Sequence, residues 1–389
     1  MNILLKLIKD FFILFRDKIL SMFYKDKKKY ENAWLFCERG IDAGDNAYHL
    51  FKYVCEKHPE IKAYFVIDYK NKEACKKLKK IGNIIDYNSY EHRMAFQLSN
   101  VYVCTHYGFI TRCNYRLYKL FFSKNKKYIF LQHGIIKDDM SRLINNLIIP
   151  LDIFVTSTND EYNSIINNKK YGYSKNVVKL TGLPRYDALN NKNIKKQILF
   201  MPTWRRTIAS LNGKIDKKKF IESDYFKKIN ELIHDKKIIN FLEKENYTMV
   251  FYPHHEIQRY IDYFKTESKR VIIAKEKDYN VQTLLKESCF LITDYSSIFF
   301  DFAYMKKPLV YYQFDKELFF STQYEKGYFS CEKDGFGPIY EDSKSVVNYI
   351  IKNPVMEKKY KNRVDSTFKY NDNKNCERVY SEIIKKINE

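Results

Sequence analysis

The sequence has no pair of cysteines at the Cys-x-x-Cys spacing, although eight cysteines occur among its 389 residues. They are scattered, and several lie inside apolar runs such as Val101–Cys104 and Cys289–Ile292. Neither a zinc site nor a disulfide framework is indicated, because the chain shows no recognisable ligand spacing and is not a small secreted domain. We therefore expect a reduced, cytosolic protein. The cysteines are Cys37, Cys55, Cys75, Cys104, Cys113, Cys289, Cys331 and Cys376.

The chain also lacks an internal repeat, and its first 30 residues contain no uncharged stretch long enough to span a bilayer. No small-residue cleavage site of the secretory kind occurs there. Residues 1–30 instead interleave apolar side chains with basic ones and end near the run Lys27–Lys29. This pattern is typical of a helix that lies on an anionic membrane surface. An ordinary amphipathic helix docked on the protein itself is the alternative.

Acidic residues are few relative to basic ones, with 47 Asp and Glu against 69 Lys and Arg and a formal net charge of +22. Such a surface attracts polyanions, which include nucleic acid, acidic lipid headgroups and phosphorylated substrates. A nucleic-acid-binding protein would gather its basic residues in one patch with stacking aromatics. Here the charge is spread along the chain, and we expect no nucleic acid partner.

The length of the chain exceeds what one hydrophobic core usually supports, which favours two domains. Short runs of β-branched and aromatic residues alternate with longer amphipathic segments, a pattern that predicts an α/β fold with parallel sheets buried on both faces. The expected strands cover residues 33–37, 63–67, 101–104, 128–132, 153–156 and 177–180 in the first half, and 197–201, 248–252, 271–274, 290–293 and 309–312 in the second.

The polar segment Asn190–Lys196 separates the two halves and is the expected linker. We predict a membrane-association segment over residues 1–30, a Rossmann-like domain over 31–190, a second over 191–370 and a C-terminal helix within 371–389. Two Rossmann-like domains facing a cleft describe the GT-B architecture.

Ligands of parallel α/β sheets bind at the carboxyl ends of the strands, and four polar clusters follow expected strands. The first is His133-Gly134. A histidine there can act as a general base, because its unperturbed pKa lies near neutrality. The glycine would let the backbone turn sharply or approach a ligand. A histidine that only caps a loop is the alternative.

The second cluster contains Thr203, Arg205 and Arg206, a plausible clamp for phosphate oxygens. Solvated arginines beside a buried tryptophan are the alternative. The third is His254-His255. This pair favours a phosphate contact over a metal site, because no third ligand lies at a recognisable spacing.

The fourth cluster runs from Asp294 through Ser296 and Ser297 into an apolar helix. A hydroxyl-rich turn between a strand and a helix can direct backbone N–H groups at an anion. Simple capping of the helix by either serine is the alternative.

The four clusters, in this order, resemble the CDP-glycerol glycerophosphotransferase family of teichoic-acid and capsule polymerases. The resemblance spans roughly residues 32–370. Further matching segments are Trp34–Arg39 with Asp45-Asn46, Thr181–Asp187, Lys307-Pro308, Tyr311–Asp315, Tyr324–Ser330 and Asp334–Pro338.

The resemblance implies a GT-B fold whose first domain binds the acceptor and whose second domain binds the donor. The implied reaction needs no metal and no cofactor: an acceptor hydroxyl attacks the polyol-bearing phosphorus, and CMP leaves. The implied partners are CDP-glycerol or a related CDP-polyol, a polymer or lipid-linked acceptor, and the membrane at its cytoplasmic face. A GT-B glycosyltransferase that uses a nucleotide sugar for surface polysaccharide is the alternative.

Carried onto this sequence, the resemblance makes His133 the candidate base and places His254, Ser296 and Ser297 on the donor diphosphate. The chain departs from the family at Lys326-Gly327, where many members have Arg-Gly; lysine keeps the charge but loses the bidentate fork. The adjacent pair Asp138-Asp139 is interpreted as a solvated loop. In full, the predicted site has His133 and His254 as catalytic residues, Thr203, Arg205, Arg206, Asp294, Ser296, Ser297 and Lys326 as donor-binding residues, and Gly134, Gly182 and Gly327 as structural residues.

Overall fold

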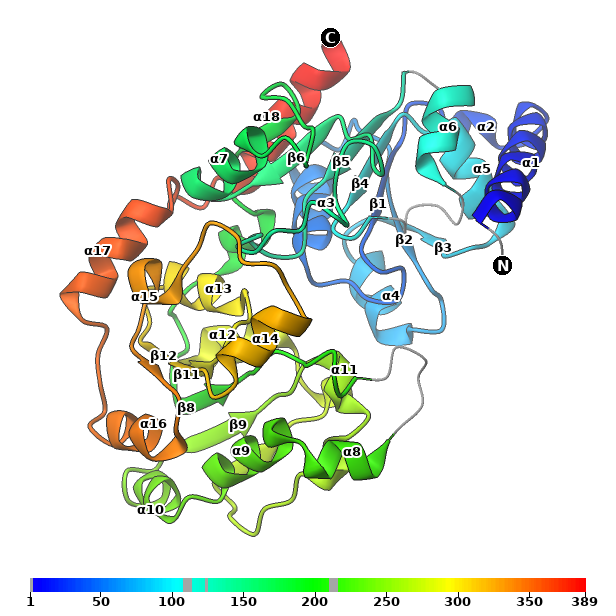
Figure 1. The fold of residues 1–389 in the computed structure, drawn as a ribbon. Helices are drawn as coiled ribbons and strands as arrows, with labels where there is room; N and C mark the ends of the chain where they lie inside the picture. The colour runs from blue at the N-terminus through cyan, green and yellow to red at the C-terminus, as the bar shows by residue number, and fades with distance from the viewer. Residues whose placement is uncertain (1–2, 108–113, 123–124, 210–215) are drawn as a thin grey trace. The chain divides into compact units, whose positions relative to one another are not determined.

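A computed structural model describes residues 3–107, 114–122, 125–209 and 216–389. The chain forms two compact units, each built on its own parallel β-sheet (Figure 1). The first unit comprises residues 1–135, 141–188 and 369–389, and the second comprises 136–140 and 189–368. The predicted α/β class with parallel sheets is confirmed. None of the seven cysteines in the described ranges forms a disulfide, and Cys113 lies outside those ranges.

The sheet of the first unit has seven strands in the order β3-β2-β1-β4-β5-β6-β7. Its central strands are buried throughout, because each is a continuous apolar run covered on both faces. The strands are β1 (Trp34–Cys37), β2 (Ala63–Ile67), β3 (Asn83–Asp86), β4 (Val101–Cys104), β5 (Lys127–Phe130), β6 (Ile153–Thr156) and β7 (Val178–Leu180). Its helices are α1 (Ile3–Met22), α2 (Lys27–Tyr30), α3 (Asn46–Lys57), α4 (Lys72–Lys79), α5 (Tyr90–Leu98), α6 (Tyr115–Phe121), α7 (Asn159–Asn167), the 3-10 helix η1 (Pro184–Ala188) and α18 (Asn375–Asn388).

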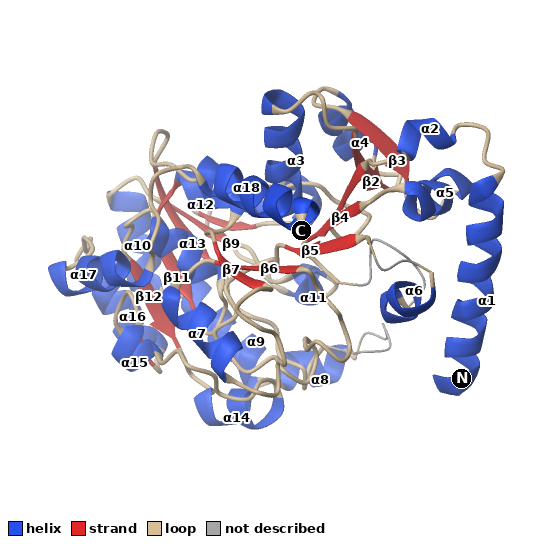
Figure 2. Ribbon diagram, turned by 90° about the horizontal axis from the view of Figure 1, so that it is seen from above, coloured by secondary structure: helices blue, strands red, loops and turns tan. Residues whose placement is uncertain are grey.

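The C-terminal helix α18 belongs to the first unit and packs beside α3 (Figure 2), whereas we expected it as a separate part of the chain. Asp187 of η1 accepts hydrogen bonds from the backbone N–H groups of Asn375 and Cys376 at 2.9 and 2.8 Å. Gly182 has a φ of +80°, and a Cβ atom there would overlap the side-chain oxygen of Asn375. The start of α18 is therefore fixed against η1, and position 182 requires glycine.

The sheet of the second unit has six strands in the order β10-β9-β8-β11-β12-β13. They are β8 (Lys195–Phe200), β9 (Thr248–Phe251), β10 (Val271–Ile273), β11 (Ser288–Thr293), β12 (Leu309–Tyr312) and β13 (Ile339–Tyr340). The helices are α8 (Lys217–Glu222), α9 (Asp224–Ile233), α10 (Lys236–Lys244), α11 (His255–Gln258), α12 (Val281–Glu287), α13 (Ile298–Tyr304), α14 (Lys316–Thr322), α15 (Cys331–Asp334), α16 (Ser343–Ile350) and α17 (Lys358–Thr367), with short 3-10 helices η2 (Ile261–Tyr263) and η3 (Glu276–Asp278).

All eleven expected strands are present within one or two residues of the expected bounds. The strands β3 and β13 were not expected, because each is a short edge strand that pairs on one side only and lacks a long apolar run. The expected linker is too long at its end, since Lys195 and Lys196 already belong to β8.

Helix α1 buries Asp10, Leu14 and Asp17 against the protein and exposes most of its other apolar side chains. Asp17 is 3% exposed and pairs with Arg93 at 3.2 Å, and Asp10 accepts a hydrogen bond from the backbone N–H of Asn114 at 3.2 Å. Figure 2 shows α1 standing beside α5 and α6. The exposed apolar residues of the helix are Leu4, Leu5, Ile8, Phe12, Phe15, Ile19, Leu20 and Met22. Within the described ranges, no helix has both the length and the apolarity needed to cross a membrane.

Candidate functional site

The loop after β5 carries His133, whose side chain is exposed. Its neighbour Gln132 has a φ of +49°, a left-handed conformation that residues other than glycine rarely adopt. The buried side chain of Gln132 fixes this conformation, because its Nε2 donates to the carbonyl of Val155 at 2.6 Å and to Oε1 of Glu161 at 2.9 Å. The left-handed turn is thus made by Gln132, whereas we expected Gly134 to allow either a sharp turn or the approach of a ligand.

Two side chains from distant segments hold the main chain at His133. Asn46 Nδ2 donates to the carbonyl of Gln132 at 2.8 Å, and Arg185 Nη1 donates to the carbonyl of His133 at 2.5 Å. Arg185 is also ion-paired with Asp45 at 2.7 Å, and its backbone N–H donates to Asn46 at 3.0 Å. These bonds join α3, η1 and the loop after β5, and they fix the backbone from which His133 projects.

Glu38 holds the loop that precedes α3. Its buried carboxylate accepts hydrogen bonds from the backbone N–H groups of Gly44, Asp45 and Tyr48 at 3.0, 2.8 and 3.0 Å. Burial, together with nearby Asp45 and Asp42, raises the pKa of Glu38 well above the ordinary value of a carboxyl group. The loop it closes carries Asp45 and Asn46, so Glu38 supports the contacts that fix the His133 loop.

A second histidine, His106, lies at the same edge of the sheet and is absent from the sequence-based predictions. It follows β4 by two residues, and its ring is stacked on that of His133 with centroids 4.6 Å apart. The signal was present in the sequence. An apolar strand that ends at Cys104 leads directly to Thr105-His106, the same pattern that identified His133.

In the second unit, Arg205 is only 3% exposed and is enclosed by carboxylates. Its guanidinium lies 2.9 Å from Asp294 Oδ2 and 2.6 Å from Asp315 Oδ2, and it donates to the carbonyl of Thr203 at 2.7 Å. Burial alone would lower the pKa of Arg205. The two carboxylates have the larger effect and raise the pKa of Arg205 above its ordinary value. The structure therefore places Arg205 and Asp294 in a buried ion-pair cluster, where their charges are already matched.

The remaining residues of this cluster are arranged around the ion pairs. The backbone N–H of Thr203 donates to Asp294 Oδ1 at 2.8 Å, and its buried hydroxyl has no hydrogen-bond partner among the described residues. Arg206 is exposed, while its backbone N–H donates to Gln323 Oε1 at 2.8 Å. In the segment that follows β8, the Arg206 side chain is thus exposed and the Arg205 side chain is buried.

His254 follows β9, which neighbours β8 in the sheet. Its Nδ1 accepts the backbone N–H of Glu256 at 3.3 Å, and in the neutral ring this bond places the proton on Nε2. The ring is half-buried and stacks near Trp204, with centroids 6.0 Å apart. Nε2 is therefore suited to donate a hydrogen bond to an oxygen anion.

Ser296 and Ser297 follow β11, the other neighbour of β8, and both are partly exposed. Ser296 Oγ accepts the backbone N–H of Ile298 at 3.4 Å, a long hydrogen bond. Ser297 precedes α13 but makes no side-chain capping bond. Capping of α13 therefore does not explain the presence of both serine hydroxyls at this turn.

Lys326 is exposed, with its ammonium 5.3 Å from the centre of the Phe320 ring. At Gly327 a Cβ atom would overlap the carbonyl oxygen of Lys137 and lie 2.7 Å from Cα of Asp138, so glycine is required by this close approach. Asp138 is 9% exposed and forms an ion pair with Lys137 at 2.5 Å. The interpretation of Asp138-Asp139 as a solvated loop is wrong for Asp138, because the segment packs against the chain around Gly327.

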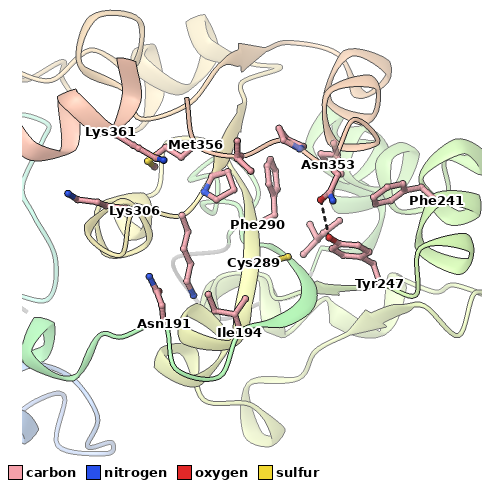
Figure 3. Close-up of a pocket in the computed structure, with 16 residues that line it drawn as sticks. Asn191, Ile194, Phe241, Tyr247, Cys289, Phe290, Lys306, Asn353, Met356 and Lys361 are labelled. Atoms are coloured by element: carbon pink, nitrogen blue, oxygen red, sulfur yellow. Dashed lines mark hydrogen bonds between the residues drawn. The ribbon is translucent and has the colours of Figure 1, made fainter. Parts of the chain in front are cut away.

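The described part of the chain holds no group of three or more His, Cys, Asp or Glu side chains suited to a metal ion. It does contain a pocket of about 350 Å³ at the amino ends of β8, β11 and β12, at the opposite edge of the sheet from the predicted residues (Figure 3). Phe290, Tyr247 and Asn353 line it, and the last two are hydrogen-bonded at 2.9 Å. None of the predicted site residues lines this pocket.

The chain is similar to known proteins over most of its length. The sequence model of a family described as CDP-Glycerol:Poly(glycerophosphate) glycerophosphotransferase matches residues 19–385. The minor teichoic acid biosynthesis protein GgaB of Bacillus subtilis (strain 168) is 37% identical over 365 residues, which cover 90% of this chain and 39% of that protein. The teichoic acid poly(glycerol phosphate) polymerase of Bacillus spizizenii is 28% identical over 207 residues, 49% of this chain and 48% of that protein.

The chain therefore spans less than half the length of these two relatives. Among solved structures, that of the wall teichoic acid polymerase TagF superposes with a TM-score of 0.67 at 17% identity, covering 99% of this chain and 97% of the other. At this identity the likeness shows a shared fold.

Proposed function

The chain belongs to the CDP-glycerol:poly(glycerophosphate) glycerophosphotransferase family, and we propose that it transfers a polyol phosphate from a CDP-polyol to a hydroxyl group of a teichoic-acid-like or capsular polymer. Glycerol phosphate from CDP-glycerol is the donor group that the family description favours. In the reaction, the acceptor oxygen bonds to the phosphorus that carries the polyol, the bond from that phosphorus to the CMP oxygen breaks, and CMP leaves. The acceptor proton passes to His133.

The gathering of side chains at the carboxyl edge of the second sheet is the observation that carries this proposal. His254, Ser296 and Arg206 follow the neighbouring strands β9, β11 and β8, and all three are at least partly exposed. Phosphoryl transfer depends on positioning and on stabilisation of charge more than on covalent chemistry. A ring N–H, hydroxyl groups and a guanidinium supply both for the donor diphosphate.

The role of Arg205 in the proposal differs from the one that its position in the motif suggested. With its charge matched by Asp294 and Asp315, it supports the segment that presents Arg206. Lys326 remains a proposed phosphate contact. Its side chain is exposed, and it is next to Gly327, where the main chain packs closely against Lys137 and Asp138. The expected cleft between the domains is also part of this proposal.

Donor selectivity tests the proposal. The purified chain is incubated with an acceptor polymer in EDTA and with either CDP-glycerol, CDP-ribitol or UDP-glucose. We expect CMP release from a CDP-polyol and none of the nucleoside diphosphate that sugar transfer would leave. Release of UDP from UDP-glucose, with no CMP from either CDP-polyol, would establish the glycosyltransferase alternative instead.

We also propose that the protein binds the cytoplasmic face of the membrane through the outer face of α1. Eight apolar side chains of α1 are exposed on that face, while Asp10, Leu14 and Asp17 are buried against the protein. A helix that only docked on its own protein would bury most of its apolar stripe, whereas α1 leaves most of its apolar side chains exposed. Phe121 of α6 is 64% exposed and packs against Phe11 with ring centroids 5.6 Å apart, which extends the apolar surface onto α6. The net charge of +22 suits anionic lipid headgroups.

Binding to vesicles tests the membrane proposal. Phe12 and Phe15 are exposed, whereas Phe11 is half-buried, so the double variant Phe12→Ser/Phe15→Ser removes apolar area without opening the protein. We expect this variant to stay in the supernatant with phosphatidylglycerol vesicles that sediment the parent protein, because buried apolar area supplies much of the binding energy. Val355→Ser, at an exposed valine of the second unit, is the matched control and should sediment normally. Sedimentation of the double variant at the parent level would contradict the proposal.

A further inference from the structure

The stacked histidines of the first unit stand out among the polar side chains there. His106 follows β4 and His133 follows β5, and these strands are parallel neighbours in which Cys104 pairs with Phe130. The two imidazole rings are nearly parallel, with 16° between their planes and 4.6 Å between their centroids. His106 is half-buried and His133 is exposed, so the pair lies at the surface of the sheet edge and not in the core.

We propose that His106 is a positioning residue for the transfer reaction, with its ring serving as a platform that fixes the ring plane of His133. The proposal rests on the proposed role of His133 as the general base. It assigns His106 no proton transfer of its own.

The contacts of His106 suit a platform. Its Nδ1 lies 3.0 Å from the hydroxyl of Thr105, a residue that is fully buried. The backbone N–H of Thr105 donates to the carbonyl of Cys37 at 3.3 Å, so the main chain that carries this hydroxyl is fixed to the end of β1. A hydrogen bond at the ring edge restricts rotation of the imidazole and leaves its face available for stacking.

The stacked ring of His106 contacts the imidazole of His133 itself, in addition to the contacts that hold the main chain there. Asn46 and Arg185 hold the backbone carbonyls of Gln132 and His133, which fixes where the side chain begins. An exposed side chain still rotates about its own torsions unless it packs against a neighbour. A stacked neighbour limits that rotation and keeps the basic nitrogen pointing in one direction, which a general base requires.

Three single variants and one double variant test the proposal. We expect His106→Ala to lower kcat by about 10- to 100-fold, the usual cost of a misplaced catalytic group. The Kd for CDP-glycerol should stay within about twofold of the parent value, because the proposed donor ligands belong to the other unit. His106→Phe keeps a flat ring without nitrogen and should recover most of the lost rate. Melting temperatures of all variants identify any loss of folding.

The double variant distinguishes positioning from an independent contribution. If His106 acts through His133, then His106→Ala/His133→Ala should be no slower than His133→Ala alone. The proposal would be overturned if the fold-losses in rate of the two single variants multiplied in the double variant. A parental rate in His106→Ala, or a loss of rate in His106→Phe equal to that in His106→Ala, would also overturn it. A parental rate in His133→Ala would instead refute the proposed base, and the positioning role would fall with it. If His133→Ala lost rate while His106→Ala kept the parental rate, the positioning role of His106 would be refuted and the role of His133 as the base would stand.

Discussion

Replacing His133 with alanine should lower the rate of transfer by about 100- to 10,000-fold, the range typical of removing a general base. The affinity for CDP-glycerol should remain nearly unchanged, because His133 belongs to the first unit and the proposed donor ligands belong to the second. The backbone of the loop is held by side chains of Asn46, Gln132 and Arg185, none of which contacts the imidazole through the bonds described above. The variant should therefore keep its fold. Calorimetric titration of CDP-glycerol alongside turnover measures both quantities.

His254→Ala is the matched comparison for this experiment. His254 follows β9 at the carboxyl edge of the second sheet, where we propose that the donor binds, so the variant should lose donor affinity as well as rate. If His133→Ala lost affinity in proportion to rate, His133 would be a donor ligand and not the base. Substantial activity in His133→Ala would exclude both roles.

Arg205→Met should destabilise the second unit by about 3–5 kcal/mol, because it leaves Asp294 and Asp315 buried without their cation. For a unit of this size, such a loss corresponds to a fall in melting temperature on the order of 10 °C. The guanidinium also lies 5.1 to 5.5 Å from the centres of four aromatic rings, and methionine preserves part of that packing. Thermal and denaturant unfolding of the variant measure the effect.

Arg206→Met is the control at the neighbouring position. Its side chain is exposed, so stability should change by no more than about 0.5 kcal/mol, while donor affinity should fall. A stable Arg205→Met protein with weakened donor binding would restore the original interpretation of Arg205 as a phosphate clamp. An unstable Arg206→Met protein would show that the two arginines have been assigned the wrong way round.

The sequence pattern does not predict which of these two arginines is buried and which is exposed. The motif placed both residues after a strand and indicated phosphate recognition, and nothing in the sequence distinguished the buried one from the exposed one. That distinction depends on Asp294 and Asp315, which follow other strands of the same sheet and close around Arg205 only when the sheet forms. Residue type and position along the chain predicted that both arginines follow a strand, whereas the burial of Arg205 and the exposure of Arg206 could not be predicted from them.

The strands themselves were predictable, because continuous apolar runs such as Val101–Cys104 are typical of strands covered on both faces. The family was also correctly predicted from the short motifs, as the match over residues 19–385 confirms. The left-handed conformation of Gln132 was not predictable, since it is stabilised by Val155 and Glu161 from distant segments. The sequence analysis expected a sharp turn or the approach of a ligand at Gly134, and the approach of a ligand stays a prediction.

His106 was missed for a different reason. The sequence pattern before it matches the pattern before His133, but the residue belongs to none of the motifs that carry the family resemblance. Only the pairing of β4 with β5 brings the two rings together. A search for polar residues at every strand end, independent of motif matches, would have found it.

The fate of the donor phosphorus tests the central claim most directly. CDP-glycerol is prepared with radioactive phosphorus in the phosphate next to glycerol, and the purified chain is incubated with it and a polymer acceptor. Transfer of glycerol phosphate predicts that the label moves onto the polymer while unlabelled CMP appears in equal amount. Label that stays on a released nucleotide, with a polymer that gains no phosphorus, would contradict the assignment of this chain as a polyol-phosphate transferase.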